Sequence, residues 1–383
     1  MDFDLSEEQR LLQESVGKLI ADEYDFEQRK AYAKEPTGFS LARWAQFAEL
    51  GLLGIPFPES LGGSGGSAVE TMIVMEAFGR GLVLEPYLAT VVLCGGILLR
   101  AGSAAQQREL IPAIAAGKLH FALAHGERQA RYDLADVATA ARTTSGGWTL
   151  NGRKAVVLHG DSADRLVVSA RSAGAERDRS GVSLFLVDAK APGVSIQGYP
   201  TVDGLRAAEI ELKDVKVGPD ALIGERDGGL EIVERAIDAG IAALAAEAVG
   251  AMTAMHEITV DYLKTRKQFG VAIGTFQALQ HRAVDMLVAL EQARSMAYLA
   301  TMMAEEPDPA ERRRAISAAK VQIGRSVRFV GQQSIQLHGG IGMTMEYKIG
   351  HYFKRVSMID TLFGDAEHHL ALVAGAGGLV DPL

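Results

Sequence analysis

The stretch DYLKTRKQFGVAIGTFQ (residues 261–277) decides the fold, because it places one tight turn between two long helical patterns. Apolar residues recur at helical spacing on both sides, and Gly270 interrupts them. The turn carries Arg266, Gln268 and Phe269, and Thr275 is placed to cap the second helix. Because a guanidinium binds oxyanions through several donors, the trio is a candidate site for a phosphate beside a planar ring. A basic residue in the last turn of a helix is also ordinary, so the turn alone leaves both interpretations open.

A second cluster makes the binding interpretation stronger. The stretch QLHGGIG (residues 336–342) follows another long helical pattern and sets the amide of Gln336 before Gly339 and Gly340. Paired glycines let a backbone approach another group closely. Together, the two clusters predict a site for a ligand at the ends of two long helices.

Composition limits the function classes. The chain has 383 residues, which fits two or three domains, and its formal charge of −9 argues against nucleic acid as a partner. A single cysteine, Cys94, rules out an internal disulfide and fits a reducing compartment. The start MDFDLSEEQR lacks the features of a signal peptide, and the apolar run at residues 87–99 is too short to span a bilayer. We therefore expect a cytoplasmic protein without a membrane partner.

The periodicity changes twice along the chain. Residues 1–118 read as helices, residues 119–228 as short strands separated by turns, and residues 229–383 as long helices with bundle seams. This predicts an α+β fold with a helical N-terminal domain, a small β-barrel or sandwich, and a C-terminal four-helix bundle. Within the middle domain, Asn151-Gly152 is the signature of a type I′ hairpin turn. The spacing of His125, His159 and His338 does not indicate a metal site. His368-His369, beside Asp365 and Glu367, fits either a metal site or a solvated helix end, and we favour the helix end.

Four stretches carry a family resemblance: PFPESLGGSGGS, GWTLNGRK, RKQFG with FQALQH, and QLHGGIGMTMEY. With these motifs in this order, the chain resembles the acyl-CoA dehydrogenase family over its whole length. Within it, the likeness is to the small subunit of pimeloyl-CoA dehydrogenases, which pair a small with a large subunit.

The resemblance implies a flavoprotein oxidoreductase of fatty acid β-oxidation that uses FAD. In the family a carboxylate removes the α-proton of an acyl-CoA while the flavin receives the β-hydride, and the protein aligns the reacting bonds. The resemblance also implies that residues at the two clusters bind the FAD of a neighbouring subunit. They are Arg266, Gln268, Phe269, Phe276, Gln277, Gln336, Gly339 and Gly340.

The chain departs from the family where its own flavin and base are expected. The flavin-cradling Thr-Glu-Pro-x-x-Gly-Ser-Asp motif falls on residues 126–133, GERQARYD, and keeps its acidic positions. The Trp-Ile-Thr that backs the flavin ring falls on residues 156–158, VVL. The catalytic Glu-Gly-Thr falls on residues 363–365, FGD, and the alternative base position on Gly240. Neither Phe363 nor Gly240 can accept a proton, so no catalytic residue is assigned.

Several alternatives stay open at this point. Asp360, Asp365 or Glu367 can act as a base if the alignment is shifted, and a carboxylate at 365 disfavours an anionic cofactor. Arg128 and Arg131 suit either an anion site or an exposed basic loop.

We interpret the chain as the subunit of a heteromeric acyl-CoA dehydrogenase that lacks the base and completes a partner's flavin site. The expected partners are an acyl-CoA, with a pimeloyl or other medium-chain dicarboxylic acyl group, and a large subunit in a heterotetramer. An electron-transfer flavoprotein is a further candidate partner, and the identity of the electron acceptor stays open. The alternatives are a self-sufficient FAD homo-oligomer with an unrecognised base and a non-catalytic acyl-CoA-binding scaffold.

Overall fold

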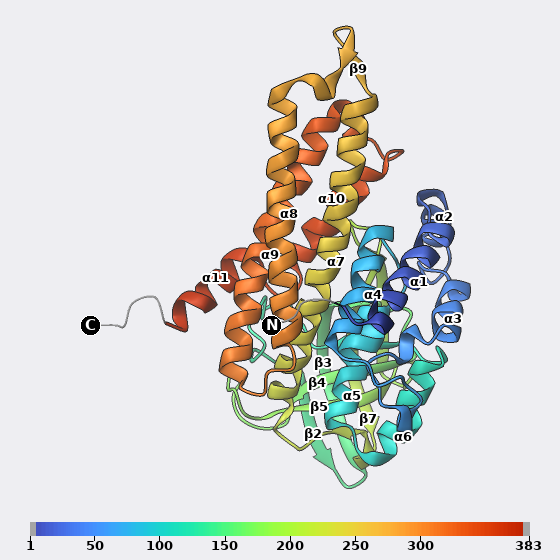
Figure 1. Cartoon of the computed structure of the whole chain (residues 1–383). Helices are drawn as coiled ribbons and strands as arrows, with labels where there is room; N and C mark the ends of the chain where they lie inside the picture. The colour runs from blue at the N-terminus through green and yellow to red at the C-terminus, as the bar shows by residue number, and fades with distance from the viewer. Residues whose placement is uncertain (1–4, 378–383) are drawn as a thin grey trace.

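The computed structural model describes residues 5–377, so residues 1–4 of the N-terminal stretch lie outside the described residues. Helices gather at the two ends of the sequence, and a β-sheet lies between them in the chain, which confirms the predicted fold class (Figure 1). The N-terminal helices lie beside the sheet, and the C-terminal helices form an upright bundle (Figure 1).

The N-terminal part starts from well-capped helices. Ser6, Ser67 and Ser103 each form a capping box with the residue three positions later, so the first backbone N–H groups are satisfied. The apolar segment after α4 winds as a π-helix, which widens the helix beside the site described below. The elements are α1 (Glu7–Glu23), α2 (Phe26–Tyr32), α3 (Leu41–Glu49), α4 (Ala68–Gly81), the π-helix η3 (Leu88–Gly95), α5 (Gly96–Ala101) and α6 (Ala104–Ala115).

The middle part is an eight-stranded sheet in the order β6-β7-β3-β2-β4-β5-β8, with β1 paired to β4. The long strands alternate inward apolar and outward polar residues, so one face buries a core of its own. The strands are β1 (Phe121–Ala124), β2 (Ala140–Thr144), β3 (Gly147–Leu158), β4 (Arg165–Arg171), β5 (Val182–Asp188), β6 (Val194–Pro200), β7 (Arg206–Val217) and β8 (Leu222–Ile223).

The predicted turn at Asn151-Gly152 is wrong. Both residues lie inside β3, where the pairing with β7 shifts register between Leu150 and Gly152. The chain instead turns between β2 and β3, where Thr144 faces Gly147. Gly152 is needed because its φ is +158° and a Cβ would come within 2.4 Å of the Thr139 hydroxyl oxygen. The glycine therefore permits a bulge in the strand. Bulges and hairpin turns favour the same residue types, which is why the sequence pattern misleads here.

The C-terminal part is built around α7 (Gly229–Thr265), which packs against α4, α8, α9 and α10. Its most apolar window is long enough to cross a membrane, but 89% of that window is buried inside the protein, as in a core helix. A small hairpin of β9 (Lys267–Gln268) and β10 (Val271–Ala272) follows it. The other helices are α8 (Gln277–Met303), α9 (Pro309–His338), α10 (Lys348–Thr361) and α11 (Ala366–Gly375).

The predicted cap by Thr275 is also wrong. Helix α8 begins after Phe276 without a side-chain cap, and the Thr275 hydroxyl donates to the carbonyl of Ala272 at 2.8 Å. A short 3-10 turn over Ile273–Thr275 uses the hydroxyl locally instead.

A buried guanidinium joins the three parts of the chain. Arg355 of α10 donates to Glu247 of α7 at 2.5 and 2.7 Å and to Asp203 of the β6–β7 loop at 2.8 Å. The backbone carbonyl of Asp203 accepts from Arg29 of α2 at 2.8 Å. Removing one member of such a network leaves a buried charge unpaired, so the junction fixes how the parts meet.

Candidate active site

A cavity of about 1310 Å³ lies between the middle sheet and the C-terminal helices. The N-terminal part contributes Ala89 and Leu93 of η3, and the sheet side contributes the segment after β1. A cavity of this size and mixed lining is the default place for a ligand. The lining residues used below are Glu127, Arg131, Tyr132, Val156, Leu158, Asp238, Ile241, Ser317, Phe363, Asp365, Glu367 and His369.

The two family base positions face each other in the structure. A Cβ added to Gly240 would lie 3.2 Å from the Phe363 ring and 2.8 Å from the Leu93 side chain. The Phe363 ring therefore fills the space beside the backbone of Gly240, which is the second base position. Two positions that sequence comparison treats separately form one apolar surface without a proton acceptor.

The turn that carries Phe363 is held by a histidine. Phe363 has a φ of +60°, which is uncommon for a bulky residue. Its carbonyl accepts from Nε2 of His369 at 3.0 Å, so Nδ1 carries no proton and accepts from the Ser317 hydroxyl at 3.1 Å. Burial and nearby Lys320 lower the pKa of His369 to about 4, so the ring is neutral near pH 7. Sequence reasoning missed this histidine's part, because its partner Ser317 lies on another helix.

The resemblance makes positions 132 and 365 hydroxyl-bearing contacts to the cofactor, and here they bond to each other. The Tyr132 hydroxyl donates to Oδ2 of Asp365 at 3.4 Å, and Nη2 of Arg131 lies 3.6 Å from the same oxygen. Oδ1 of Asp365 accepts from the backbone N–H of His368 at 2.9 Å and caps α11. This backbone hydrogen bond, with help from Tyr132 and Arg131, lowers the pKa of Asp365. The Asp365 carboxylate therefore places a negative charge where, by the resemblance, family members contact their anionic cofactor.

The wall of the cavity behind the expected flavin ring is aliphatic. Val156 lines the cavity, is 51% exposed and has a φ of +52°, next to a register shift in the pairing of β3. Leu158 lines the cavity further along, whereas Val157 points into the sheet core. The wall offers neither an aromatic face nor a hydroxyl.

The three alternative bases have different surroundings. Asp360 is buried, pairs with Arg328 at 2.9 Å and accepts from the backbone N–H of Ala366, and it does not line the cavity. Asp365 lines the cavity but is used as the cap of α11. Glu367 lines the cavity and is exposed, so it is solvated. None of the three stands beside Phe363 as an unengaged buried carboxylate, which is the usual form of a tuned base.

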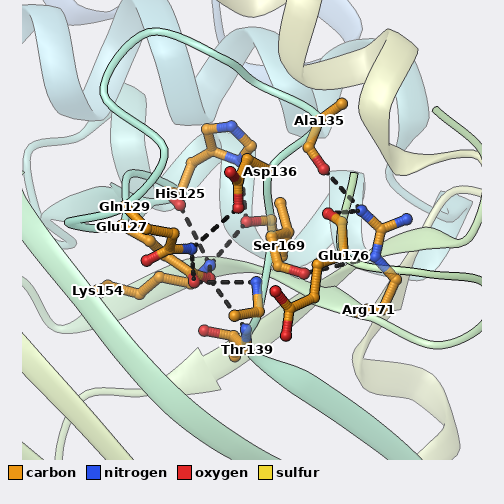
Figure 2. Close-up of polar contacts among 12 residues, drawn as sticks. His125, Glu127, Gln129, Ala135, Asp136, Thr139, Lys154, Ser169, Arg171 and Glu176 are labelled. Atoms are coloured by element: carbon orange, nitrogen blue, oxygen red, sulfur yellow. Dashed lines mark hydrogen bonds and ion pairs between the residues drawn. The ribbon is translucent and has the colours of Figure 1, made fainter. Parts of the chain in front are cut away.

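A buried ion pair supports the cradle segment, and sequence reasoning missed it. Nζ of Lys154 donates to Glu127 at 2.7 Å, to the carbonyl of His125 at 3.1 Å and to the Ser169 hydroxyl at 3.1 Å (Figure 2). Glu127 also accepts the backbone N–H groups of Ala138 and Thr139. Burial raises the pKa of Glu127, but Lys154 and these hydrogen bonds more than offset it and lower that pKa to about 2. The acidic position retained in the cradle motif is thus a structural anchor.

A second buried acid lies on the cavity-facing side of α7. Asp238 accepts from Nε of Arg312 at 2.9 Å, and its pKa is raised because burial outweighs the attraction of that guanidinium. It stands two positions before Gly240, and its arginine partner prevents it from acting as an unpaired base.

The bundle end presents the opposite arrangement. Phe269 is 91% exposed at the tip of the β9–β10 hairpin, which protrudes beyond the helices (Figure 1). The Arg266 side chain is exposed and has no ion pair or hydrogen bond to another described residue. Gln268 bonds to its neighbour's carbonyl at 2.9 Å, and Phe276 lies 6.2 Å from the Phe269 ring, centroid to centroid.

The second sequence cluster lies at the same end. The ring of His338, in the last turn of α9, stacks on Tyr262 in the last turns of α7 at a centroid distance of 4.5 Å. Gly339 then leaves the helix with a φ of +63°, and a Cβ on Gly339 or Gly340 would meet open space. The aromatic stack therefore brings the two clusters to one end of the bundle.

The described residues offer FAD two surfaces of different quality. At the bundle end, the side chains of Arg266, Gln277 and Gln336 have donors with no partner among the described residues, and Phe269 supplies an aromatic face. These groups fit the phosphates and rings of a dinucleotide. In the cavity, the hydroxyl positions are closed by Tyr132 and Asp365, so the residues present do not fit the cofactor there.

Family models cover nearly all of the described chain. They are the acyl-CoA dehydrogenase N-terminal domain over residues 6–118, the middle domain over residues 122–215, and the C-terminal domain over residues 227–377. The caffeyl-CoA reductase–Etf complex subunit CarC of Acetobacterium woodii is 30% identical over 86% of this chain and 88% of its own length.

Solved structures agree with the family models. A variant of the Tcur3481-Tcur3483 steroid ACAD superposes with a TM-score of 0.86 at 30% identity, covering 97% of each chain. The FAD complex of PigA superposes with a TM-score of 0.90 at 27% identity, covering 98% of each chain. The cofactor of the family is FAD, as in the PigA complex, which agrees with the expectation from the sequence.

Proposed function

The chain belongs to the acyl-CoA dehydrogenase family, whose members are FAD-dependent oxidoreductases that act on CH–CH bonds, and we propose that it is the subunit of a heteromeric member without a base. The observation that carries this proposal is the contact between Phe363 and Gly240. Both places from which the family draws a proton acceptor lie in one apolar contact. Within residues 5–377, neither of these two positions offers the thioester a carboxylate to remove its α-proton.

The same subunit lends residues to a partner's flavin. FAD, when bound, accepts the hydride from the β-carbon of the acyl group. The proposed role of this chain is to bind and orient that cofactor through Arg266, Gln268, Phe269, Phe276, Gln277, Gln336, Gly339 and Gly340. The uncommitted donors of Arg266 and the exposed ring of Phe269 support the assignment, because arginine and aromatic residues are enriched where protein surfaces meet a partner.

The proposed partner is an acyl-CoA dehydrogenase chain that carries the base, in a heterotetramer. Relatives whose names describe assemblies support a heteromer: CarC is named as a complex subunit with Etf, and the steroid enzyme is named by two chains. An electron-transfer flavoprotein is the proposed acceptor, again by analogy with the name of the CarC complex.

The proposed substrate is an acyl-CoA of medium chain length. Ala89, Leu93 and Ile241 make one part of the cavity lining apolar, which suits the methylene groups of an acyl chain. A pimeloyl group, which the sequence resemblance suggests, needs a partner for its terminal carboxylate. Arg131 is the lining cation that pairs most loosely, at 3.6 Å from Asp365, and is the proposed contact for such a terminus.

The test is the flavin content of the chain purified alone and with its partner, read from absorbance and protein concentration. We expect close to no flavin in the isolated chain and full loading in the assembly. Stoichiometric flavin in the isolated chain would contradict the proposal and favour a self-sufficient homo-oligomer. Absence of flavin from both preparations would favour a non-catalytic acyl-CoA-binding scaffold.

A further inference from the structure

A second, smaller cavity of about 30 Å³ lies behind the wall of the first, because Ala89 and Leu158 line both cavities. We call it the junction chamber. A buried water needs roughly 10–15 Å³ of such space, so the chamber has room for about one or two water molecules. Its polar lining residues, each at most 6% exposed, are Glu85, His159, Glu247 and Arg355.

His159 brings a buried ring nitrogen without a partner to the chamber. Within residues 5–377, its Nδ1 has no hydrogen bond. Burial, with a smaller contribution from Arg355, lowers the pKa of the ring to about 3, so the imidazole is neutral near pH 7. Each nitrogen of a neutral imidazole is either a donor or an acceptor. Because buried polar atoms in folded proteins nearly always have a partner, Nδ1 needs one that the described residues do not supply.

The position of the His159 ring is fixed by the backbone and by packing. The residue directly follows β3 and has a φ of +52°. Its backbone N–H donates to the carbonyl of Arg206 at 2.9 Å, and its ring packs edge-on against Phe39 at a centroid distance of 6.0 Å. These contacts keep the ring at the chamber, so a partner for Nδ1 has to reach it there.

Glu85 brings a carboxyl group to the same space. Its Oε2 accepts from the Tyr24 hydroxyl at 2.8 Å, and its Oε1 accepts from the backbone N–H of Ser40 at 3.2 Å. Burial outweighs these hydrogen bonds and raises the pKa of Glu85 to about 7, so both protonation states are populated at neutral pH. In either state the carboxyl group has capacity for a further hydrogen bond.

Arg355 adds donors to the chamber. Its Nε and Nη2 donate to Glu247, and its Nη1 donates to Asp203. Each Nη nitrogen of a guanidinium carries two N–H groups, so Nη1 and Nη2 each keep one N–H without a partner among the described residues. The chamber is therefore lined by a donor, a carboxyl group and an unpaired ring nitrogen.

We propose that the junction chamber is a binding site for internal water, in which one molecule bridges His159, Glu85 and Arg355. The water accepts an N–H of Arg355, hydrogen-bonds to Nδ1 of His159 and forms a third hydrogen bond with the Glu85 carboxyl group. About three hydrogen bonds are typical of a buried water. Glu85 lies between α4 and η3, His159 follows β3, and Arg355 lies in α10, so the water joins the three parts of the chain behind the cavity wall.

The direct test is a crystal structure of the wild-type chain at a resolution that orders internal waters. We expect an electron-density peak within about 2.7–3.2 Å of Nδ1 of His159, the Glu85 carboxyl group and the Arg355 guanidinium. A chamber without density, in a structure that orders other internal waters, would overturn the proposal. A peak that contacts only the carboxylates of Glu85 and Glu247, as a cation would, overturns it as well.

Magnetic relaxation dispersion of the water oxygen counts internal waters in solution and provides a second test. His159→Phe removes Nδ1 and should lower the count by about one or two, whereas Glu85→Gln keeps a polar group at the chamber and should leave it unchanged. His281→Phe, at an exposed position of α8, is the matched control and should also leave it unchanged. Equal counts for the wild type and His159→Phe would contradict the proposal.

The wild-type crystal structure decides alone if His159→Phe does not fold. Neither measurement involves flavin content, so the test of the water site is independent of the test of the proposed function.

Discussion

In the cavity, Tyr132 and Asp365 use each other as hydrogen-bond partners, whereas at the bundle end Arg266 and Gln336 have none among the described residues. Both regions hold positions that the family devotes to one cofactor. A polar group that bonds within its own chain must give up that bond to bind a ligand, whereas an exposed donor gives up only its bond to water. The contrast suggests that the chain has kept the half of the site that serves a neighbour and has filled the half that would serve itself.

The largest effect is expected from removing the ion pair beneath the cradle. Lys154→Met leaves the Glu127 carboxylate buried without its cation and should lower the free energy of unfolding by about 3–5 kcal/mol. Chemical denaturation measures this loss. Arg153→Met, next to it and exposed, should cost within about 0.5 kcal/mol. Equal effects of the two substitutions would mean that the pair does not anchor the cavity side.

The next effect tests the bundle end. Arg266→Ala should weaken flavin retention in the assembly by about 1.5–3 kcal/mol, because a hydrogen bond to a charged group is lost. Flavin release on dilution, followed by fluorescence, measures it. Lys264→Ala, on the preceding helical turn and also exposed, is the control and should leave retention unchanged. Unchanged flavin affinity in the Arg266 variant would remove the bundle end from the cofactor site.

A smaller effect is expected in the cavity. Asp365→Asn keeps an oxygen to cap α11 and removes the negative charge, so the isolated chain should bind FAD more tightly by about 1 kcal/mol. Titration of the isolated chain with FAD measures the change. The control is Asp360→Asn, which removes a carboxylate that does not line the cavity. If the Asp365 variant binds no better than the wild type, charge is not what excludes the cofactor.

The last substitution is expected to leave the activity of the isolated chain unchanged. Phe363→Glu restores a carboxylate at a family base position, yet the isolated chain should stay inactive, because the ring-backing residues Val156 and Leu158 remain aliphatic. The assay follows reduction of an artificial electron acceptor with a medium-chain acyl-CoA and added FAD. Turnover in this variant would show that the cavity can still work by itself.

The fold class could be predicted from the sequence, because helical and strand periods are local signals. The meeting of the two clusters at one bundle end follows from the packing of α7 against α9 and is seen only in the structure. The Glu127–Lys154 pair could not be predicted either, because Glu127 follows β1 and Lys154 lies in β3, 27 residues further along the chain. Asn151-Gly152 and Thr275 misled for a different reason. Bulges and turns draw on the same residue types, and a hydroxyl beside a helix start has more than one nearby acceptor.

Helix α7 runs from beside the cavity to the hairpin, so it sets a fixed span between the two regions. Gly240 lies beside Phe363 and Arg266 ends the helix, and at about 1.5 Å per residue they are roughly 40 Å apart. The length of the helix thus fixes the distance between the two regions. With a dye attached beside the cavity and a flavin bound at the bundle end, energy transfer over a distance that the helix sets would report whether a partner has docked.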